Sequence, residues 1–209
     1  MNNLSRRQKE KKERELAMID AAEKIFINKG FDNVSMNEIA KEAEFTKRTL
    51  YKYFESKEEL YFAVAIKGFH KMFSYYMDAE EGQNGFDKLK LVSKAYYHFF
   101  KECPETVRII NHVRQINKKE VLGPKHRQWR EIDEQIFKKL AFVFEEGIAD
   151  GSIRSDIEPL KGAYTFIFIL NGFLHMISES DDSFLEHFSS DVEDFTGLGL
   201  KLVSGIFKS

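Results

Sequence analysis

The sequence predicts an all-α fold, with an N-terminal helix-turn-helix domain of three helices, a C-terminal helical domain, and about nine helices in all. Three observations support this prediction. Apolar residues recur three to four positions apart in one segment after another, which is the period of a helix with one buried face. Candidate helix caps precede several of these segments. The 209 residues include only three prolines and few clusters of β-branched residues, so the composition gives little support to strands.

A long connector helix is expected to join the two domains. The helix-turn-helix domain is predicted for residues 1–57, the connector for 57–78, and the second helical domain for 79–209. Gly82 and Gly85 interrupt the helical pattern just after the connector. A chain of this length can bury a sizeable core in one or two domains.

Two closely spaced helices are predicted immediately before the connector. Ser35 and Glu38 form a capping-box pattern that starts the first, and Thr46 is the candidate N-cap of the second. Ser56 and Glu59 form a further capping-box pattern at the start of the connector. Helix, short turn, helix is the order of elements in a helix-turn-helix.

The segment at residues 39–60, IAKEAEFTKRTLYKYFESKEEL, resembles the DNA-binding segment of the TetR (tetracycline-repressor-like) transcription regulators. The resemblance covers roughly the first third of the chain and consists of many residues in fixed register. One position departs from the family: Glu44 stands in the turn where the family usually has Gly, and it must adopt or avoid a left-handed conformation at a modest cost. The shared residues are Ala21, Ala22, Phe26, Lys29, Gly30, Phe31, Ile39, Ala40, Ala43, Thr46, Leu50, Tyr51, Tyr53, Phe54, Lys57 and Leu60.

The helix that follows Thr46 has the side chains of a DNA-reading helix. If it enters the major groove N-terminus first, Lys47, Arg48 and Thr49 face the base edges. Arg48 is the candidate for a bidentate contact with guanine, which is worth about 1–3 kcal/mol of discrimination. Ser35 and Thr46 can offer hydroxyls or helix-start amides to phosphates.

The resemblance adds further residues to this predicted surface. It places Asn37, Thr49 and Tyr53 near DNA, and it puts Tyr51 and Lys57 at positions that usually hold phosphates. The full set of predicted DNA-binding residues is Ser35, Asn37, Thr46, Lys47, Arg48, Thr49, Tyr51, Lys52, Tyr53 and Lys57.

Each of these residues also has a purely structural interpretation. Thr46 can serve only as a helix cap, and Tyr53 only as a packing residue. Arg48 and Lys57 can be solvated charges, and Leu50 is expected in the core.

The first helix is predicted at about residues 7–28, with Gly30 in the position that follows its end. Its start is basic, since residues 5–14 carry six Lys or Arg against two Glu. A basic run beside a helix-turn-helix can lie along a DNA backbone or cross the minor groove. The alternative is a solvated charged face.

Five further helices are predicted after the connector, at about residues 86–102, 105–118, 125–149, 160–178 and 191–207. The last two are expected to form a dimer surface, because the helix at 160–178 is too apolar to face water on every side. The resemblance implies a four-helix bundle made with the same two helices of a second chain; the alternative is that both are internal core. The predicted interface residues are Phe166, Leu170, Phe195, Leu198, Leu202 and Ile206.

The resemblance also implies a small-molecule effector bound by the second domain, which would then be a regulatory and dimerisation domain. Phe99, His112, Trp129 and Phe166 are the candidates to line the pocket, although each can equally be an ordinary packing residue. The expected function is a ligand-responsive transcription regulator. It would be a repressor that binds a palindromic double-stranded DNA operator as a homodimer and is released by its effector. The alternatives are a regulator (activator) without a small-molecule ligand and a helical protein-interaction module.

Composition and motifs argue against an enzyme, a metal site or a cofactor. The chain has no His-Glu-x-x-His, no Gly-rich phosphate loop and no Gly-x-Ser-x-Gly, and its six histidines lack zinc-like spacing. Cys103 is the one cysteine, so no internal disulfide can form. We expect no membrane association and a cytoplasmic location, because neither an apolar leader nor an apolar run long enough to cross a bilayer is apparent. The net charge of −2 does not indicate a nucleic-acid binder, but a net value hides local patches.

Overall fold

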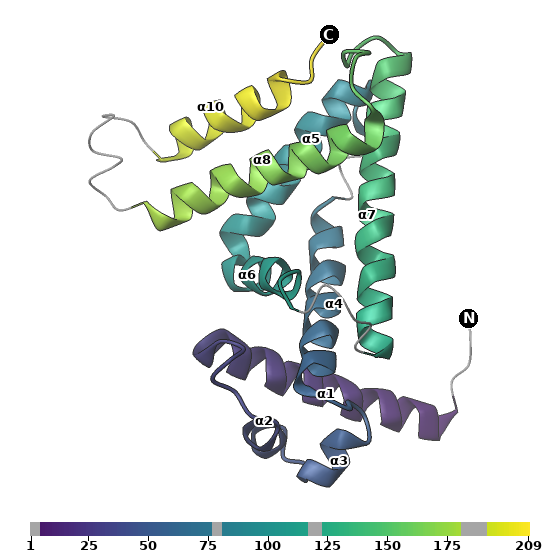
Figure 1. Cartoon of the computed structure of the whole chain (residues 1–209), viewed down its shortest axis with the longest axis vertical. Coiled ribbons are helices and arrows are strands. Elements are labelled where there is room, and N and C mark those ends of the chain that lie inside the picture. The colour runs from purple at the N-terminus through teal and green to yellow at the C-terminus, as the bar shows by residue number, and fades with distance from the viewer. Residues whose placement is uncertain (1–4, 77–80, 117–122, 181–191) are drawn as a thin grey trace. The chain divides into compact units, whose positions relative to one another are not determined.

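Figure 1 shows the chain as a series of helices, in a computed structural model that describes residues 5–76, 81–116, 123–180 and 192–209. Within these ranges there are nine helices and no strand, so the predicted all-α fold is confirmed. An isolated β-bridge pairs Ile153 with Lys208. The helices are α1 (Arg6–Lys29), α2 (Met36–Glu42), α3 (Lys47–Tyr51), α4 (Lys57–Tyr75), α5 (Gly85–Glu102), α6 (Pro104–Val113), α7 (Pro124–Ala149), α8 (Pro159–Glu179) and α10 (Val192–Gly205).

The chain forms two compact units. Unit 1 contains Met1–His70 and Glu105–Ile132, and unit 2 contains Lys71–Pro104 and Asp133–Ser209. The division differs from the predicted domain boundary near residue 79, because α6 and the first part of α7 pack with the N-terminal helices. Helical periodicity does not reveal such a division, since it marks the buried face of a helix but not the partner that covers it.

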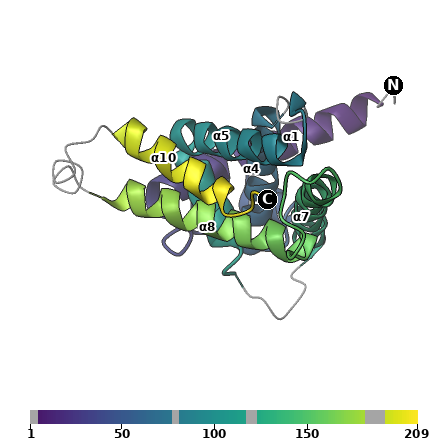
Figure 2. The same cartoon turned by 90° about the horizontal axis from the view of Figure 1, so that it is seen from above.

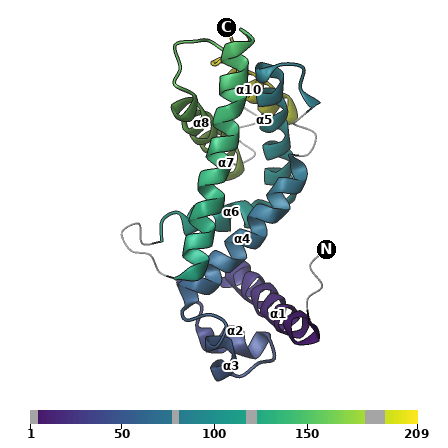
Figure 3. The ribbon, with the colours of Figure 1, turned by 90° about the vertical axis from the view of Figure 1, so that its right-hand side faces the viewer.

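In unit 1, α1 is capped at both ends. Ser5 and Gln8 form a reciprocal capping box at its start. At its end Gly30 has a φ of 74°, and its N–H donates to the carbonyl of Phe26 at 2.9 Å, as predicted for a glycine after the helix. Figure 3 shows α1 beside α2 and α3, and the core between them includes Met18, Phe26, Ile39, Leu50 and Phe54, all almost fully buried.

Ion pairs fix the outer sides of the same unit. Lys67 of α4 lies 2.5 Å from both Asp20 and Glu23 of α1. Burial acts to lower the pKa of Lys67, but the hydrogen bonds that its ammonium donates to these two carboxylates outweigh it, so the pKa is raised above its ordinary value. Lys125 at the start of α7 pairs with Glu15 at 2.8 Å, which ties a second helix to α1.

The capping box predicted for Ser56 and Glu59 at the start of α4 is only half formed. The Ser56 hydroxyl accepts from the Glu59 N–H at 3.1 Å, so half of the expected capping box is present. The Glu59 carboxylate, however, accepts from the backbone N–H groups of Lys125 and His126 at 2.9 and 3.1 Å. It caps α7 instead of its own helix. The residue before α7 is Gly123, which has no side chain to accept from the first amides of that helix.

Unit 2 is built from α5, α8, α10 and the second part of α7. Figures 1 and 2 show α8 and α10 side by side, and Gly199 allows their close approach, since a side chain there would overlap the ring of Phe173. In the core, Phe207 packs edge-on against Phe144 at 5.1 Å and against Phe166 at 5.9 Å between ring centroids. These contacts place Phe207, close to the end of the described chain, in the interior of the unit.

Two buried polar pairs join α5 to its neighbours in unit 2. The hydroxyls of Ser93 in α5 and Ser204 in α10 lie 2.9 Å apart and are both buried. The Tyr96 hydroxyl of α5 donates to the side-chain oxygen of Asn171 in α8. Because each buried polar group has a partner, these contacts specify one relative position of the three helices.

Several helix ends differ from their predicted positions. α6 ends at Val113, whereas the prediction continued to residue 118. Gln115 and Ile116 donate to the carbonyls of His112 and Val113, three residues back, so the last turn is tighter than an α-helix and terminates it. The predicted ends at residues 78, 118 and 191 lie outside the described residues.

The helix α8 contradicts the expectation that no apolar run of the chain is long enough to cross a bilayer. By length and composition alone this 21-residue helix could cross a membrane, and it is the one described helix of which this is true. Such a helix is weak evidence for a membrane span, because core helices meet the same criteria. In this chain α8 buries one face, including Ala163 and Leu174, in unit 2.

Candidate nucleic-acid interface

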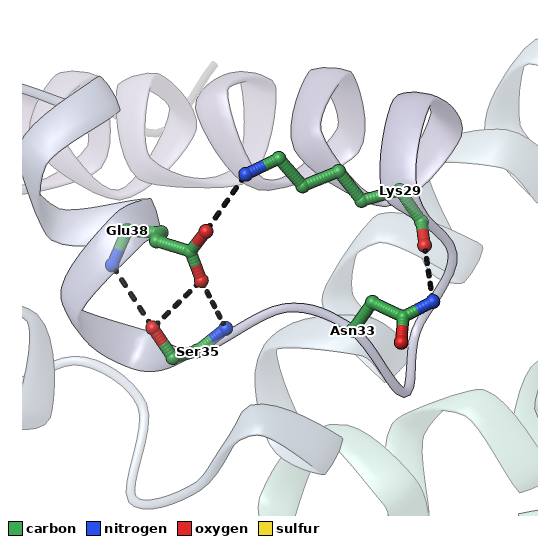
Figure 4. Close-up of polar contacts among 4 residues, drawn as sticks. All are labelled: Lys29, Asn33, Ser35 and Glu38. Carbon is green, nitrogen blue, oxygen red and sulfur yellow. Dashed lines mark hydrogen bonds and ion pairs between the residues drawn. The ribbon is translucent and has the colours of Figure 1, made fainter.

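The start of α2 is held by a four-residue polar network, drawn in Figure 4. The Ser35 hydroxyl accepts from the Glu38 N–H at 3.3 Å, and the Glu38 carboxylate accepts from the N–H and hydroxyl of Ser35 at 2.9 and 2.8 Å. Lys29 adds an ion pair with Glu38 at 2.7 Å, and Asn33 donates to the Lys29 carbonyl at 3.0 Å. The predicted capping box is therefore confirmed, and the Ser35 hydroxyl is engaged within it.

These contacts change the acidity of Glu38. The hydrogen bond from Lys29, followed by those from the backbone and side chain of Ser35, lowers the pKa of Glu38 from 4.5 to about 2. The carboxylate is thus ionised at neutral pH and stands in the first turn of α2, where negative charge favours the helix.

The turn between α2 and α3 contains Glu44 in the left-handed conformation, with φ 58°. Its N–H donates to Lys41 O at 3.1 Å, and the N–H of Phe45 donates to Ala40 O at 2.9 Å. These two bonds are the pair that defines a Schellman motif, in which the residue after the helix cap is left-handed. Glu44 therefore adopts the geometry of the usual glycine, and the conformational cost falls on a residue with a side chain.

The helix α3 presents its N-terminal half to solvent. Thr46 caps it as predicted, accepting from the Thr49 N–H at 3.1 Å, and the two threonine hydroxyls lie 2.8 Å apart. Lys47 and Arg48 are exposed, and Leu50 is fully buried beneath them. The result is a short helix anchored from below, with two adjacent cations on its outer side.

The remaining predicted residues fall into two groups. Asn37, Lys52 and Tyr51 are exposed, and Tyr51 lies under the Lys47 ammonium at 5.8 Å from its ring centroid. Thr49 and Tyr53 are half-buried. Most of the candidates in α2 and α3 are therefore accessible to solvent.

Lys57 is not a freely solvated cation. Its ammonium donates to the Phe31 carbonyl at 2.8 Å and lies 4.3 Å from the centroid of the Phe31 ring. It therefore ties the start of α4 to the loop between α1 and α2. Sequence spacing misses this role because the two residues are 26 positions apart.

The predicted pocket residues are distributed over both units. Phe99 and Phe166 are fully buried in unit 2. In unit 1, the ring of His112 lies 3.1 Å from the Tyr61 hydroxyl through Nδ1, and Trp129 packs against Phe62 at 5.4 Å between centroids. The contacts of His112 and Trp129 thus lie within unit 1.

The predicted dimer residues divide between the core and the surface. Phe166 and Leu170 have no exposed surface within the single chain, so their assignment to an interface is corrected to core. Leu198 and Leu202 of α10 and Ile206, which directly follows α10, are exposed, and Phe195 is half-buried against Phe173.

Sequence reasoning missed the exposed apolar residues of α8. Phe168 and Met176 are exposed, whereas Phe166, Leu170 and Leu174 are buried. The exposed and buried rows are offset by two positions, which is about 200° around a helix. The helical period could have separated these two faces, because three successive fourth residues, Phe166, Leu170 and Leu174, are large and apolar while the row from Phe168 contains Gly172.

The fold and this surface define a class of protein: one that carries a helix-turn-helix, whose second helix bears basic and hydroxyl side chains. Residues 18–64 match the model of the bacterial regulatory proteins of the tetR family. The N-terminal part of the chain thus matches the family that its sequence resemblance indicated. Among the described residues, no group of three His, Cys, Asp or Glu is arranged to hold a metal ion.

Known proteins similar to this chain are transcriptional regulators, which are not enzymes. The uncharacterised HTH-type regulator YuxN of Bacillus subtilis is 40% identical over 67 residues, 32% of this chain and 20% of that protein. The HTH-type transcriptional activator FasR of Mycolicibacterium smegmatis is 29% identical over 99 residues, 47% of this chain and 45% of that protein. The matched part of this chain spans less than half the length of these curated relatives.

Solved structures show the same fold over nearly the whole chain. FadR from Bacillus subtilis in complex with stearoyl-CoA has a TM-score of 0.68 at 19% identity, covering 90% of this chain and 97% of that one. The ketosteroid regulator KstR2 of Mycobacterium tuberculosis has a TM-score of 0.64 at 18% identity, covering 94% and 95%. AibR, in complex with isovaleryl coenzyme A and operator DNA, has a TM-score of 0.61 at 22% identity, covering 75% and 83%.

Proposed function

We propose that this protein is a ligand-responsive transcriptional repressor that binds a palindromic DNA operator as a homodimer and leaves it when a small molecule binds. The observation that carries the proposal is the surface of α3. Lys47 and Arg48 are exposed at the N-terminal half of a helix that is fixed in place by buried Leu50 and by the Thr46 cap. An α-helix fits the major groove, where every base pair presents a distinct pattern of donors and acceptors. The protein would act in the cytoplasm, where its operator is.

The roles of the surface residues follow from their chemistry. Arg48 has a planar guanidinium that can donate two hydrogen bonds to one guanine. Lys47, Lys52 and the Tyr51 hydroxyl are suited to phosphate oxygens, as is the exposed amide of Asn37. Lys57 contributes mainly by holding the loop that precedes α2, because its ammonium is engaged with Phe31.

Dimerisation is supported by the exposed apolar side chains of α8 and α10. Phe168 and Met176 of α8 are exposed, as are Leu198 and Leu202 of α10 and Ile206 just after it. The two helices are adjacent in unit 2. Exposed apolar residues in such a concentration mark a surface that another protein covers. A second copy of the chain would double the number of reading helices and give two half-sites related by symmetry.

The effector is proposed to be an acyl-coenzyme A or a related acyl compound. FadR and AibR, which share this fold, are described in complex with stearoyl-CoA and isovaleryl coenzyme A. A third structure of the same fold is a putative fatty acid metabolism regulator from Clostridium perfringens, with a TM-score of 0.66 at 21% identity. Among the described residues the buried indole N–H of Trp129 has no acceptor, so it is available to a polar ligand atom.

Selection of bound duplexes from a random DNA library, at two salt concentrations, tests the proposal. We expect an enriched palindrome with half-sites about one helical turn or more apart. Arg48→Ala should relax the preference at one base pair of each half-site and cost about 1–3 kcal/mol per contact. Arg127→Ala, which removes an exposed arginine from α7, is the matched control and should change neither quantity.

The same duplex then tests the remaining parts of the proposal. Placed over a promoter, it should lower transcription in the presence of the protein, and added acyl-CoA of graded chain length should restore it. Enhanced transcription would identify an activator, and unaltered binding in every acyl-CoA would reject this effector class. Equal binding to all duplexes would mean that the protein contacts only the DNA backbone and does not read the sequence. No binding would favour a protein-interaction module.

A further inference from the structure

The N-terminal part of α1 extends beyond the core of unit 1. The helix begins at Arg6 and is capped by Ser5 and Gln8, but its first buried residue is Met18. Residues 5–14 are all exposed, and they carry six Lys or Arg against two Glu. Figure 1 shows this end of α1 projecting past α3. The basic run is therefore an ordered helical extension of the helix-turn-helix and not a separate tail.

Three of its cations continue the buried face of the helix. Arg7, Lys11 and Arg14 each stand eleven residues before a buried residue of the unit 1 core. The three buried residues are Met18, Ala22 and Ile25. Eleven residues are about three turns of an α-helix, so each cation shares the direction of its buried counterpart to within about 20°. Lys29 stands eleven residues after Met18, so it shares this direction, and it pairs with Glu38 of α2 at 2.7 Å. The stripe therefore faces the side of α1 on which α2 packs.

Two other cations of the extension face elsewhere. Lys9 and Lys12 stand eleven residues before Asp20 and Glu23, which pair with Lys67 of α4 at 2.5 Å. By the same reasoning they are directed to the α4 side of α1. The extension therefore carries two separable basic faces, of which one is aligned with the side that holds the helix-turn-helix.

We propose that Arg7, Lys11 and Arg14 form a second DNA contact, which binds phosphates of the backbone beside the base pairs read by α3. The inference rests on the proposed DNA binding. From Arg7 to Arg14 the stripe is about 10 Å long, and phosphates of one strand recur about every 3.4 Å along the duplex axis. Two or three phosphates thus lie within its reach. The neighbouring Glu10 is paired with Arg6 at 3.1 Å, which reduces its effect on the stripe.

The contact is to the backbone and not to the bases. Long flexible cations on a helix that lies outside the recognition element bind phosphate oxygens without regard to sequence. Such contacts raise affinity through the release of counterions, so each phosphate bound adds about 0.9 to the slope of log K against log salt concentration. The stripe should therefore alter the salt dependence of binding while leaving the selected sequence unchanged.

Two matched double variants of the full chain test the inference on the duplex selected by the unmodified protein. Arg7→Gln with Lys11→Gln removes two charges from the proposed stripe, and Lys9→Gln with Lys12→Gln removes two from the other face. Gln preserves helix propensity, and circular dichroism should show equal helix content in both. The first variant should reduce the salt slope by about 2 and weaken binding about tenfold or more near 0.1 M salt. The second should keep the slope within about 0.5 of the unmodified value.

Three outcomes would overturn the inference. Equal effects of the two variants would mean that only the net charge of the segment matters, and an unchanged slope in the first would mean that its face is merely solvated. A changed consensus sequence in the first variant would mean base contacts in place of backbone contacts. If the unmodified chain selects no duplex, the proposed function falls with the inference, whereas the other outcomes leave the proposed function standing.

Discussion

The carboxylate of Glu59 in α4 accepts a hydrogen bond from the backbone N–H of His126 in α7, 67 residues away, at 3.1 Å. It accepts a second from Lys125 at 2.9 Å, and the Glu59 residue is only 3% exposed. The His126 ring stacks on Phe62 with centroids 4.4 Å apart. The pKa of His126 is lowered, mainly by burial and secondly by the nearby charge of Arg130, and these effects outweigh the opposite effect of Glu59. A charged side chain of one helix thus stabilises the first turn of another.

Glu59→Gln should destabilise unit 1. The amide keeps one acceptor oxygen but turns its NH₂ group toward backbone donors, which leaves a buried N–H without a partner. We expect a loss of about 1–3 kcal/mol in the free energy of unfolding, measured by urea denaturation. Glu58→Gln, at the adjacent and more exposed position, is the control and should change stability by less than about 0.5 kcal/mol. Equal losses in the two variants would reject the cross-helix cap.

Glu44→Gly should stabilise the protein. The left-handed conformation costs about 1–2 kcal/mol for a residue with a Cβ, and glycine removes this cost. Part of the benefit is offset, because glycine also raises the conformational entropy of the unfolded chain. The net expectation is about 0.5–1 kcal/mol, seen as a rise of about 1–4 °C in Tm. Glu44→Val should lower Tm, because a β-branched residue tolerates the left-handed region less well. A lower Tm for the glycine variant would show that the glutamate side chain makes a stabilising contact.

Glu38 should give the protein a specific acid sensitivity. Its folded-state pKa of about 2 lies below its ordinary value of 4.5, so its contribution to stability is complete above about pH 4.5. That contribution is lost as the pH falls from 4.5 through 2. Glu38→Gln should therefore show a shallower loss of stability over this interval, measured by denaturant unfolding at several pH values. Asn33→Ala leaves the partners of the carboxylate in place, so it should retain the steeper profile. Parallel profiles for Glu38→Gln and the unmodified protein would contradict the depressed pKa.

Leu202→Glu should prevent dimerisation without unfolding the chain. Leu202 lies on the outer side of α10 and is 61% exposed, so the charge is solvated in the monomer but would be buried in the proposed interface. Sedimentation should show a dimer for the unmodified protein and a monomer for this variant. The control is Phe142→Glu, which places the same charge at a 58% exposed apolar residue of α7. A dimer in both variants would locate the interface elsewhere, and a monomeric unmodified protein would reject it.

The sequence predicts local structure better than it predicts contacts between distant residues. The caps at Ser35 and Thr46 and the end of α1 at Gly30 follow from residues within one turn of each other. The partners of Glu59 and Lys57 lie 66 and 26 residues away, and no helical period encodes them.

A second difficulty for prediction from sequence is deciding which face of a strongly apolar helix is buried. α8 has large apolar residues on both sides, so hydrophobicity alone assigns Phe166 and Leu170 to a surface that Phe168 and Met176 occupy. The local structure of α3 was more accessible to prediction, because its cap Thr46 and its buried anchor Leu50 stand within a single short segment.

The buried contact between Ser93 and Ser204 shows that α10 has an inward side and an outward side with different roles. Ser204 faces the interior and fixes where α10 lies, whereas Leu198, Leu202 and Ile206 face outward on the opposite side. Substitutions on the outer side can therefore alter which chain is recognised without disturbing the core. Duplicated copies of such a gene could diverge into regulators that no longer pair with each other, while each keeps the same fold.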